Sequence, residues 1–143
     1  MKWKDPMTCC RSSRVVHVVL FAAFLMAWTI ALLLPVPAQS AERVLGDPFS
    51  VFMFGKGLHI AAYAFLTILG GTAALFGRNW VWILPGLIVH GGVTEILQGF
   101  VGRTSRIEDV GLDAVGIGLG ALAVLAWRRI TRPTSAGGTA SQA

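Results

Sequence analysis

Three residues that could carry chemistry are spaced along one apolar stretch of the sequence. Lys56, His59 and Tyr63 follow one another at intervals of three and four residues. In a helix this spacing puts them on one face, within about 60° of each other. An imidazole can transfer protons near neutral pH, and an ammonium beside it can neutralise an anionic group. Each residue alone also fits a packed or interfacial position, but together they predict a polar helix stripe.

A carboxylate lies inside another apolar stretch. Glu95 and Gln98 are three residues apart and share a helix face. A charged side chain within a bilayer costs about 3 kcal/mol on insertion scales, so it usually faces a partner or water. We expect Lys56 or His59 to be the partner of Glu95, because consecutive spans form an antiparallel hairpin. Glu95 and His59 are therefore the candidates for general acid or base.

The polar segment 101–109 contains two arginines. Arg103 and Arg106 could present planar guanidinium groups to a carboxylate or a phosphate. Anionic lipid headgroups and membrane-linked phosphates are suitable targets. The alternative is an exposed loop whose charges pair with one another.

An acidic stripe follows this segment. Asp109, Asp113, Gly116 and Gly120 fall on one helix face. The two glycines would allow another helix backbone to approach closely. The face that bears the acids is then the one that packs inward, and we expect Asp113 to be paired or protonated.

The remaining histidines suggest no further site. His17 and His90 match no partner pattern and are interpreted as structural. Glu95, His59 and Asp109 could converge, but their spacing is not that of a known metal site. We therefore expect no metal and no cofactor.

Four apolar blocks must position these residues. The chain has 143 residues, of which 55% are hydrophobic and 13% charged. Each block has about the 17–25 residues that cross a bilayer as a helix, and none alternates as a membrane barrel strand would. The first block exceeds a normal signal-peptide core, although cleavage after it stays an alternative. We predict an all-α integral membrane bundle with four transmembrane helices: Val15–Leu34, Leu58–Phe76, Trp80–Leu97 and Val110–Trp127.

The charges predict the orientation and the domain limits. Eight of the twelve basic residues lie before the first block, between the second and third, and after the fourth. Positive residues stay inside, so both termini should be cytoplasmic, and the net charge of +5 reflects topology rather than nucleic-acid binding. We predict a basic N-terminus over 1–14, a membrane domain over 15–127 and a basic, then disordered tail over 128–143. Residues 36–54 are predicted to form an outer loop, with the apolar stretch 49–54 in the headgroup layer.

The polar residues resemble the signature of a known family. The pattern Lys56-x2-His59-x3-Tyr63, then Glu95-x2-Gln98-x-Phe100-x2-Arg103-x5-Asp109, then Gly116 and Gly120, is similar to that of the VanZ-like family. The resemblance covers about residues 20–127. It departs from the family at Asp113, where Asn is common, and at Val101, where Pro is common. It implies a multi-pass protein of the bacterial cytoplasmic membrane, related to a protein associated with teicoplanin resistance.

Two functions are compatible with these residues. One is an enzyme that acts on an anionic lipid or a lipid-linked wall intermediate at the outer face. Its catalytic residues would be Glu95, His59 and Lys56, and its substrate-binding residues Tyr63, Gln98, Arg103, Arg106, Asp109 and Asp113. The other is a non-catalytic binder or modulator of an envelope component or a glycopeptide antibiotic. A small transporter is a third, less favoured reading, and the sequence leaves open whether the protein is an enzyme. The expected partners are the lipid bilayer and a second copy of the chain in a homo-oligomer, without nucleic acid.

The orientation can be tested by thiol labelling. Single cysteines replacing Leu45 or Thr104, in a chain without Cys9 and Cys10, should react with an impermeant reagent added outside the cell. Both positions lie in segments predicted to face outward. Labelling only from the cytoplasmic side would reverse the predicted orientation.

Overall fold

The structure is a computed structural model and is described here for residues 6–34, 43–44, 46–72, 77–101 and 107–131. Within these ranges the long elements are all helices: α1 (Pro6–Leu33), α3 (Pro48–Thr72), α4 (Ile83–Phe100) and α5 (Ile107–Thr131). The short 3₁₀ helix η1 (Gly77–Trp82) leads directly into α4. Four segments of the helices are long and apolar enough to cross a membrane. The prediction of an all-α fold with four helices long and apolar enough to span a membrane is confirmed for these residues.

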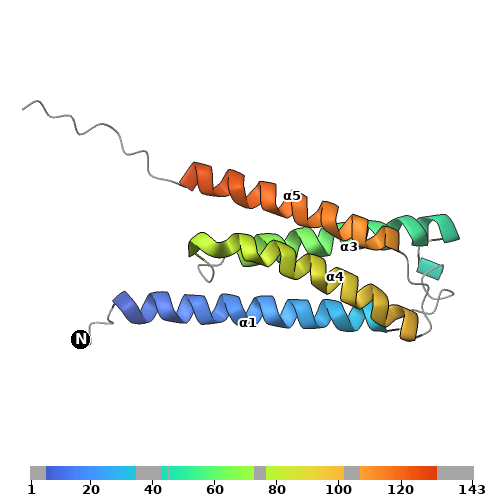
Figure 1. The fold of residues 1–143 in the computed structure, drawn as a ribbon, viewed down its shortest axis with the longest axis horizontal. Helices are drawn as coiled ribbons and strands as arrows, with labels where there is room; N and C mark the ends of the chain where they lie inside the picture. The colour runs from blue at the N-terminus through green and yellow to red at the C-terminus, as the bar shows by residue number, and fades with distance from the viewer. Residues whose placement is uncertain (1–5, 35–42, 45, 73–76, 102–106, 132–143) are drawn as a thin grey trace, which may run out of the picture.

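The helices run alternately up and down (Figure 1). We call the end at which α1 begins and α5 ends the termini end, and the opposite end, where α3 and α5 begin, the site end. Helices α3 and α5 make the most extensive contact, and α1 lies along the opposite side against α3 and α4. The start of α1 and the end of α5 lie at one end of the bundle, whereas the cytoplasmic location of the termini stays a prediction.

Helix α3 begins about ten residues earlier than predicted. Residues 48–54 belong to α3 and not to a loop, so that part of the prediction is wrong. Asp47 caps the helix, because its two carboxylate oxygens accept hydrogen bonds from the Ser50 amide at 2.8 Å and the Ser50 hydroxyl at 2.7 Å. These bonds lower the pKa of Asp47 below its ordinary value. Pro48 follows at the first helical position, where its fixed φ suits a helix start.

The other predicted spans are close to the observed helices. The candidate membrane span within α1 is Val15–Leu33, and the one formed by η1 and α4 is Asn79–Phe100. Helix α5 starts at Ile107 rather than Val110, so Glu108 and Asp109 lie in its first turn. Acidic residues are favourable there, because the amide groups of the first turn point towards them. The last four residues of the predicted second span, 73–76, lie outside the described residues.

Two glycines bring α5 against the backbone of α3. A side chain at Gly116 would collide with the Ile60 carbonyl group, and one at Gly120 would lie 2.6 Å from the Ala64 carbonyl oxygen. Only glycine leaves room for such an approach. The predicted inward-facing role of these glycines is therefore confirmed.

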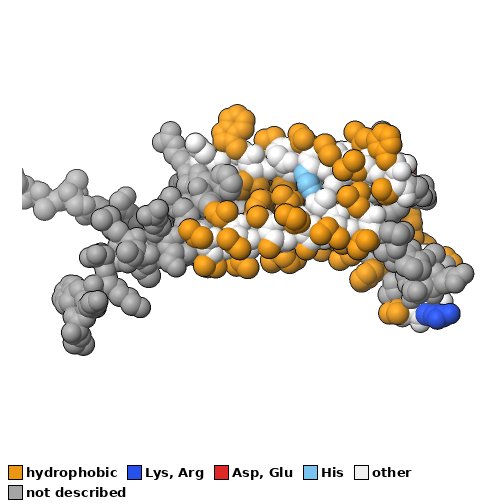
Figure 2. Space-filling view, turned by 90° about the horizontal axis from the view of Figure 1, so that it is seen from below, with side chains coloured by type: hydrophobic (Ala, Val, Ile, Leu, Met, Phe, Trp, Pro, Cys, Tyr) orange, Lys and Arg blue, Asp and Glu red, His pale blue; other side chains and the backbone are white. Residues whose placement is uncertain are grey.

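The outer surface of the bundle is apolar. Large hydrophobic side chains such as Met26, Val89 and Leu122 are more than half exposed. Figure 2 shows one face in which hydrophobic side chains dominate, with a histidine among them. In a bilayer such a surface faces lipid, so it needs no protein partner. Polar groups must instead be satisfied between the helices.

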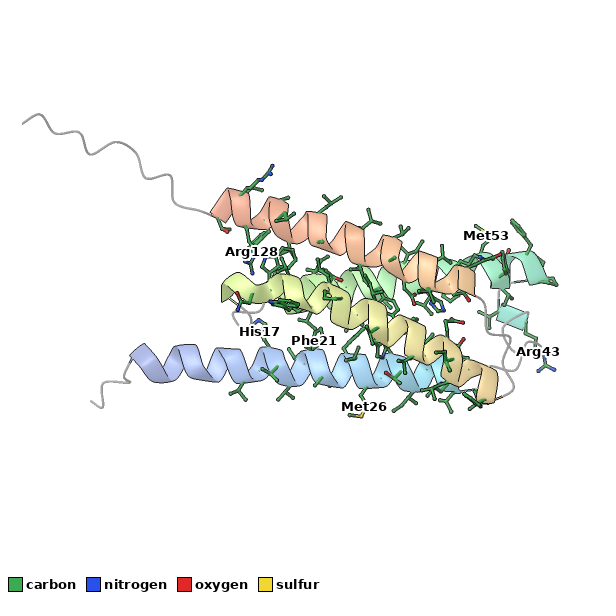
Figure 3. All side chains as sticks on the ribbon, viewed as in Figure 1. His17, Phe21, Met26, Arg43, Met53 and Arg128 are labelled. Carbon is green, nitrogen blue, oxygen red and sulfur yellow. The ribbon has the colours of Figure 1, made fainter. Side chains whose placement is uncertain are left out.

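At the termini end, the cationic side chain of Arg128 connects three elements. Arg128 points from α5 into the bundle (Figure 3), donates a hydrogen bond to the Gly71 carbonyl at 2.8 Å and stacks 5.1 Å from the centre of the Trp80 ring. The carbonyl belongs to the last turn of α3, where backbone acceptors lack helical partners. Arg128 therefore links the ends of α3 and α5 to η1.

Substituting Gly116 by Ala should loosen the α3–α5 contact. The added methyl group meets a rigid carbonyl group, so we expect the unfolding free energy in bilayer-like bicelles to fall by about 1–3 kcal/mol. The matched control is Gly118→Ala on the same helix, where an added Cβ meets nothing within 4 Å. Equal stability of the two variants would contradict the packing described above.

Candidate functional site

The polar side chains of the bundle lie mainly towards the site end. An exposed ion pair marks the rim, where Lys56 Nζ lies 3.5 Å from Glu108 Oε2. The ammonium also lies 4.7 Å from the centre of the Phe52 ring. The Glu108 side chain is 73% exposed, and exposed pairs contribute about 0–1 kcal/mol to stability. Lys56 can therefore exchange this partner for an anionic ligand at small cost.

The next polar pair is buried. His59 Nδ1 lies 2.8 Å from Asp113 Oδ1, and Asp113 is only 1% exposed. The Trp28 and His59 rings pack in a T-shaped arrangement, with centroids 5.7 Å apart. A buried carboxyl group that holds an imidazole fixes its orientation and can stabilise its protonated form. This arrangement is a histidine–carboxyl dyad, and the prediction that Asp113 is paired is confirmed.

A second histidine takes part in a separate hydrogen-bonded chain. Thr29 donates its only hydroxyl proton to the Leu25 carbonyl at 2.8 Å. Its oxygen must therefore accept from His90 Nε2, which lies 2.8 Å away. In a neutral imidazole Nδ1 is then an acceptor, and the Tyr63 hydroxyl donates to it at 3.0 Å. These bonds join α1, α3 and α4 in the interior.

His90 has hydrogen-bond partners that the sequence analysis does not predict. Its interpretation as a structural residue agrees with these bonds, which join three helices. A signal was nevertheless present, because His90, Thr94 and Gln98 recur every four residues and form a polar stripe on α4. Thr94 and Gln98 are buried in the structure. Thr29 was missed too, since a lone threonine in an apolar helix carries no pattern of its own.

The far end of α4 brings Glu95 and Gln98 into the bundle. Glu95 is 4% exposed, and the Gln98 side chain donates to the Leu32 carbonyl at 3.2 Å, which ties α4 to the last turn of α1. Lys56 and His59 both lie within hydrogen-bond distance of acids of α5, because the glycine contact brings α5 closer to α3 than α4 comes. Glu95 interacts electrostatically with His59, and its predicted pairing with Lys56 or His59 stays a prediction.

The predicted site is therefore partly assembled by the fold. Lys56, His59, Tyr63 and Asp113 lie along the α3–α5 contact. Asp109 is half-buried in the first turn of α5 and interacts electrostatically with His59, as does Glu95. Arg103 and Arg106 lie outside the described residues. Among the residues that the structure describes, no group of three or more His, Cys, Asp or Glu side chains could hold a metal ion.

An apolar groove lies beyond His90, towards the termini end. Its volume is about 240 Å³, and it opens between α1 and the η1–α4 segment. Phe21 points into this region from α1 (Figure 3). The lining is almost entirely hydrocarbon and aromatic, consisting of Phe21, Leu25, Trp82, Ile83, Gly86, Leu87 and His90. The polar chain thus ends at His90 on this side.

Comparison of the chain with protein-family models, with curated protein sequences and with solved structures gives no match. The resemblance to the VanZ-like family rests on residue spacing alone and stays a prediction. The site contains an oriented imidazole, a partly exposed cation and buried carboxyl groups.

The dyad can be tested through stability. Replacing His59 by Phe leaves Asp113 buried without its partner, so we expect unfolding to become easier by about 3–5 kcal/mol. The double variant His59→Phe with Asp113→Leu removes both polar groups and should recover most of this loss. Lys56→Gln, at the exposed pair, should change stability by no more than about 1 kcal/mol. Additive losses in the double variant would show that the two side chains do not depend on each other.

Proposed function

We propose that the site end binds the anionic headgroup of an amphiphile and that His59 transfers a proton to or from it. The single observation that carries this proposal is the 2.8 Å contact between His59 and the buried Asp113. A buried acid is costly in a membrane helix unless it serves a partner. Here it orients an imidazole one helical turn from a partly exposed cation, and this is the arrangement that general acid–base catalysis needs.

Each residue has a separate role in this proposal. Lys56 neutralises the anionic group after leaving Glu108, and His59 acts on the bound headgroup. Glu95, near His59 and 4% exposed, is the second candidate for proton transfer. Arg103 and Arg106 are proposed to contact the same headgroup, and Gln98 to hold α1 against α4 around it.

The charge pattern supports an outward-facing site. With the basic segments inside, the site end faces away from the cytoplasm. The substrate would then be an anionic lipid or a lipid-linked envelope molecule in a bacterial cytoplasmic membrane, as the resemblance to the VanZ-like family also implies. A role in resistance to teicoplanin-type glycopeptides belongs to the same proposal.

A second candidate function is binding without turnover. The specific observation in its favour is that Tyr63, His90 and Thr29 bond to one another. Groups that satisfy each other hold helices in place rather than act on a ligand. The protein would then retain or shield an envelope component or a glycopeptide, with Lys56 as its contact.

Product analysis separates the two candidates. Purified protein in bilayers should be incubated with anionic phospholipids and lipid-linked wall intermediates, and products followed by mass spectrometry. If the enzyme proposal is right, a product appears, and His59→Gln and Glu95→Gln reduce its formation at least about 100-fold, as loss of an acid–base group does. Lys56→Gln should mainly raise KM.

The control variant is Thr72→Val, an exposed position at the opposite end of α3. It should leave product formation unchanged. Saturable binding that depends on Lys56 without any product would favour the binder. If neither a product nor binding is detected with any of these lipids, both candidate functions are wrong for this class of ligand.

A further inference from the structure

One buried oxygen is left over in the polar interior. Asp113 Oδ1 bonds to His59, but Asp113 Oδ2 is buried and has no hydrogen-bond partner among the residues that the structure describes. This oxygen faces Gly91. A Cβ placed on Gly91 would lie 2.7 Å from Asp113 Oδ2 and 3.3 Å from the Tyr63 hydroxyl. The two oxygens therefore border the same small space, and the Tyr63 hydroxyl interacts with the Asp113 carboxyl group across it.

The direction of the Tyr63 proton explains why that oxygen is unpaired. When His90 is neutral, its Nε2–H donates to Thr29 and its Nδ1 accepts from Tyr63. The one hydroxyl proton of Tyr63 then points at His90 and away from Asp113. When His90 is protonated, Nδ1–H becomes a donor to the Tyr63 oxygen. The hydroxyl proton is then free to turn towards Asp113 Oδ2.

We propose that Tyr63 passes a proton between His90 and Asp113. In the forward step the Nδ1–H bond of His90 breaks and that proton forms a new O–H bond on Tyr63. The original O–H bond of Tyr63 breaks, and its proton forms an O–H bond on Asp113 Oδ2. His90 ends neutral, Tyr63 is unchanged, and Asp113 ends as a carboxylic acid. The reverse step restores an imidazolium and a carboxylate.

This exchange would regulate the dyad. A carboxylate at Asp113 favours a protonated His59, whereas a neutral acid does not. The bearing on His59 chemistry rests on the function proposed above, but the exchange itself does not. Other charged groups act on the dyad: Glu95 from α4 and Asp109 from α5 both interact with His59. On the α1 side the neighbouring polar groups are Thr29 and Trp28, which do not titrate in this range.

Tyr63, His90 and Asp113 hold this proton among themselves and do not move it across the membrane. Beyond His90 the groove is lined by Phe21, Leu25, Ile83 and Leu87, which offer no proton acceptor. We therefore expect proteoliposomes containing the protein to conduct no more protons than empty liposomes. Proton flux abolished by Tyr63→Phe would overturn this storage role in favour of a through-path.

The chain suits a direct test because Tyr63 is its only tyrosine and it has three histidines. The full-length protein would carry ¹³Cζ-tyrosine and ¹⁵N-histidine labels in nanodiscs of phosphatidylethanolamine and phosphatidylglycerol. NMR spectra over a pH series then report on the Tyr63 hydroxyl and on each imidazole. We expect the Tyr63 Cζ signal and the His90 ring nitrogens to change together with a common midpoint. Separate midpoints, or a silent Tyr63, would overturn the proposal without any variant.

Substitutions then separate passage through Tyr63 from charge acting through space. Asp113→Asn should shift the His90 midpoint by about one pH unit, the size that marks coupled sites. In the Tyr63→Phe background the same substitution should produce a clearly smaller shift, because only the charge of Asp113 acting through space on His90 remains. A shift of undiminished size there would show that the coupling bypasses the hydroxyl, and would falsify the proposal.

The matched control is Trp28→Phe, which removes another polar group that interacts with the Tyr63 hydroxyl. It should leave the shift intact, because Trp28 lies outside the proposed path. Loss of the shift in this variant would contradict the path. The measurement contains no substrate, so its outcome is separate from the outcome of the product analysis.

Discussion

The approach of α5 to the backbone of α3 determines where most of the polar groups lie. At Gly116 and Gly120 the two helices are separated by little more than their own main-chain atoms. Such contact fixes both rotation and register, because a side chain at either glycine would force the helices apart. One turn before Gly116, Asp113 is consequently set opposite His59, and Glu108 lies near Lys56. Without this contact the acids of α5 would face lipid, where a charge is unfavourable.

The polar groups become more buried and more fully hydrogen-bonded with increasing distance from the site end. At the rim, Lys56 and Glu108 are partly exposed and loosely held. Deeper in the bundle, His59 and Asp113 are held at hydrogen-bond distance, and beyond them Tyr63, His90 and Thr29 satisfy one another. A ligand can compete for the outer partners more easily than for the inner ones, because inner groups have no water to replace a lost bond. The rim is thus suited to recognition and the interior to orientation.

The four helices could be predicted from the sequence because the hydrocarbon of a bilayer places strong requirements on the composition and length of a helix that crosses it. The stripes on α3 and α5 were also predicted, since helical periodicity alone places Lys56, His59 and Asp113 on packed faces. Which polar side chains pair with each other could not be predicted in the same way. Whether Glu95 or Asp113 meets His59 depends on which pair of helices packs most closely, and sequence neighbours in a hairpin are not always the closest pair. The early start of α3 follows from the Asp47–Pro48 start signal, which prevails over the loop-like composition of the stretch before it.

Gly91 has a consequence for how this sequence can vary. Its missing side chain leaves the space that Asp113 Oδ2 and the Tyr63 hydroxyl occupy. Even an alanine there would need the carboxyl group to move, so the two positions on α4 and α5 constrain each other in volume. Among relatives of this chain, residues 91 and 113 are therefore expected to change together. A larger residue at position 91 should accompany a shorter or apolar one at position 113. Such chains should then lack both the acid at position 113 and the histidine that it orients.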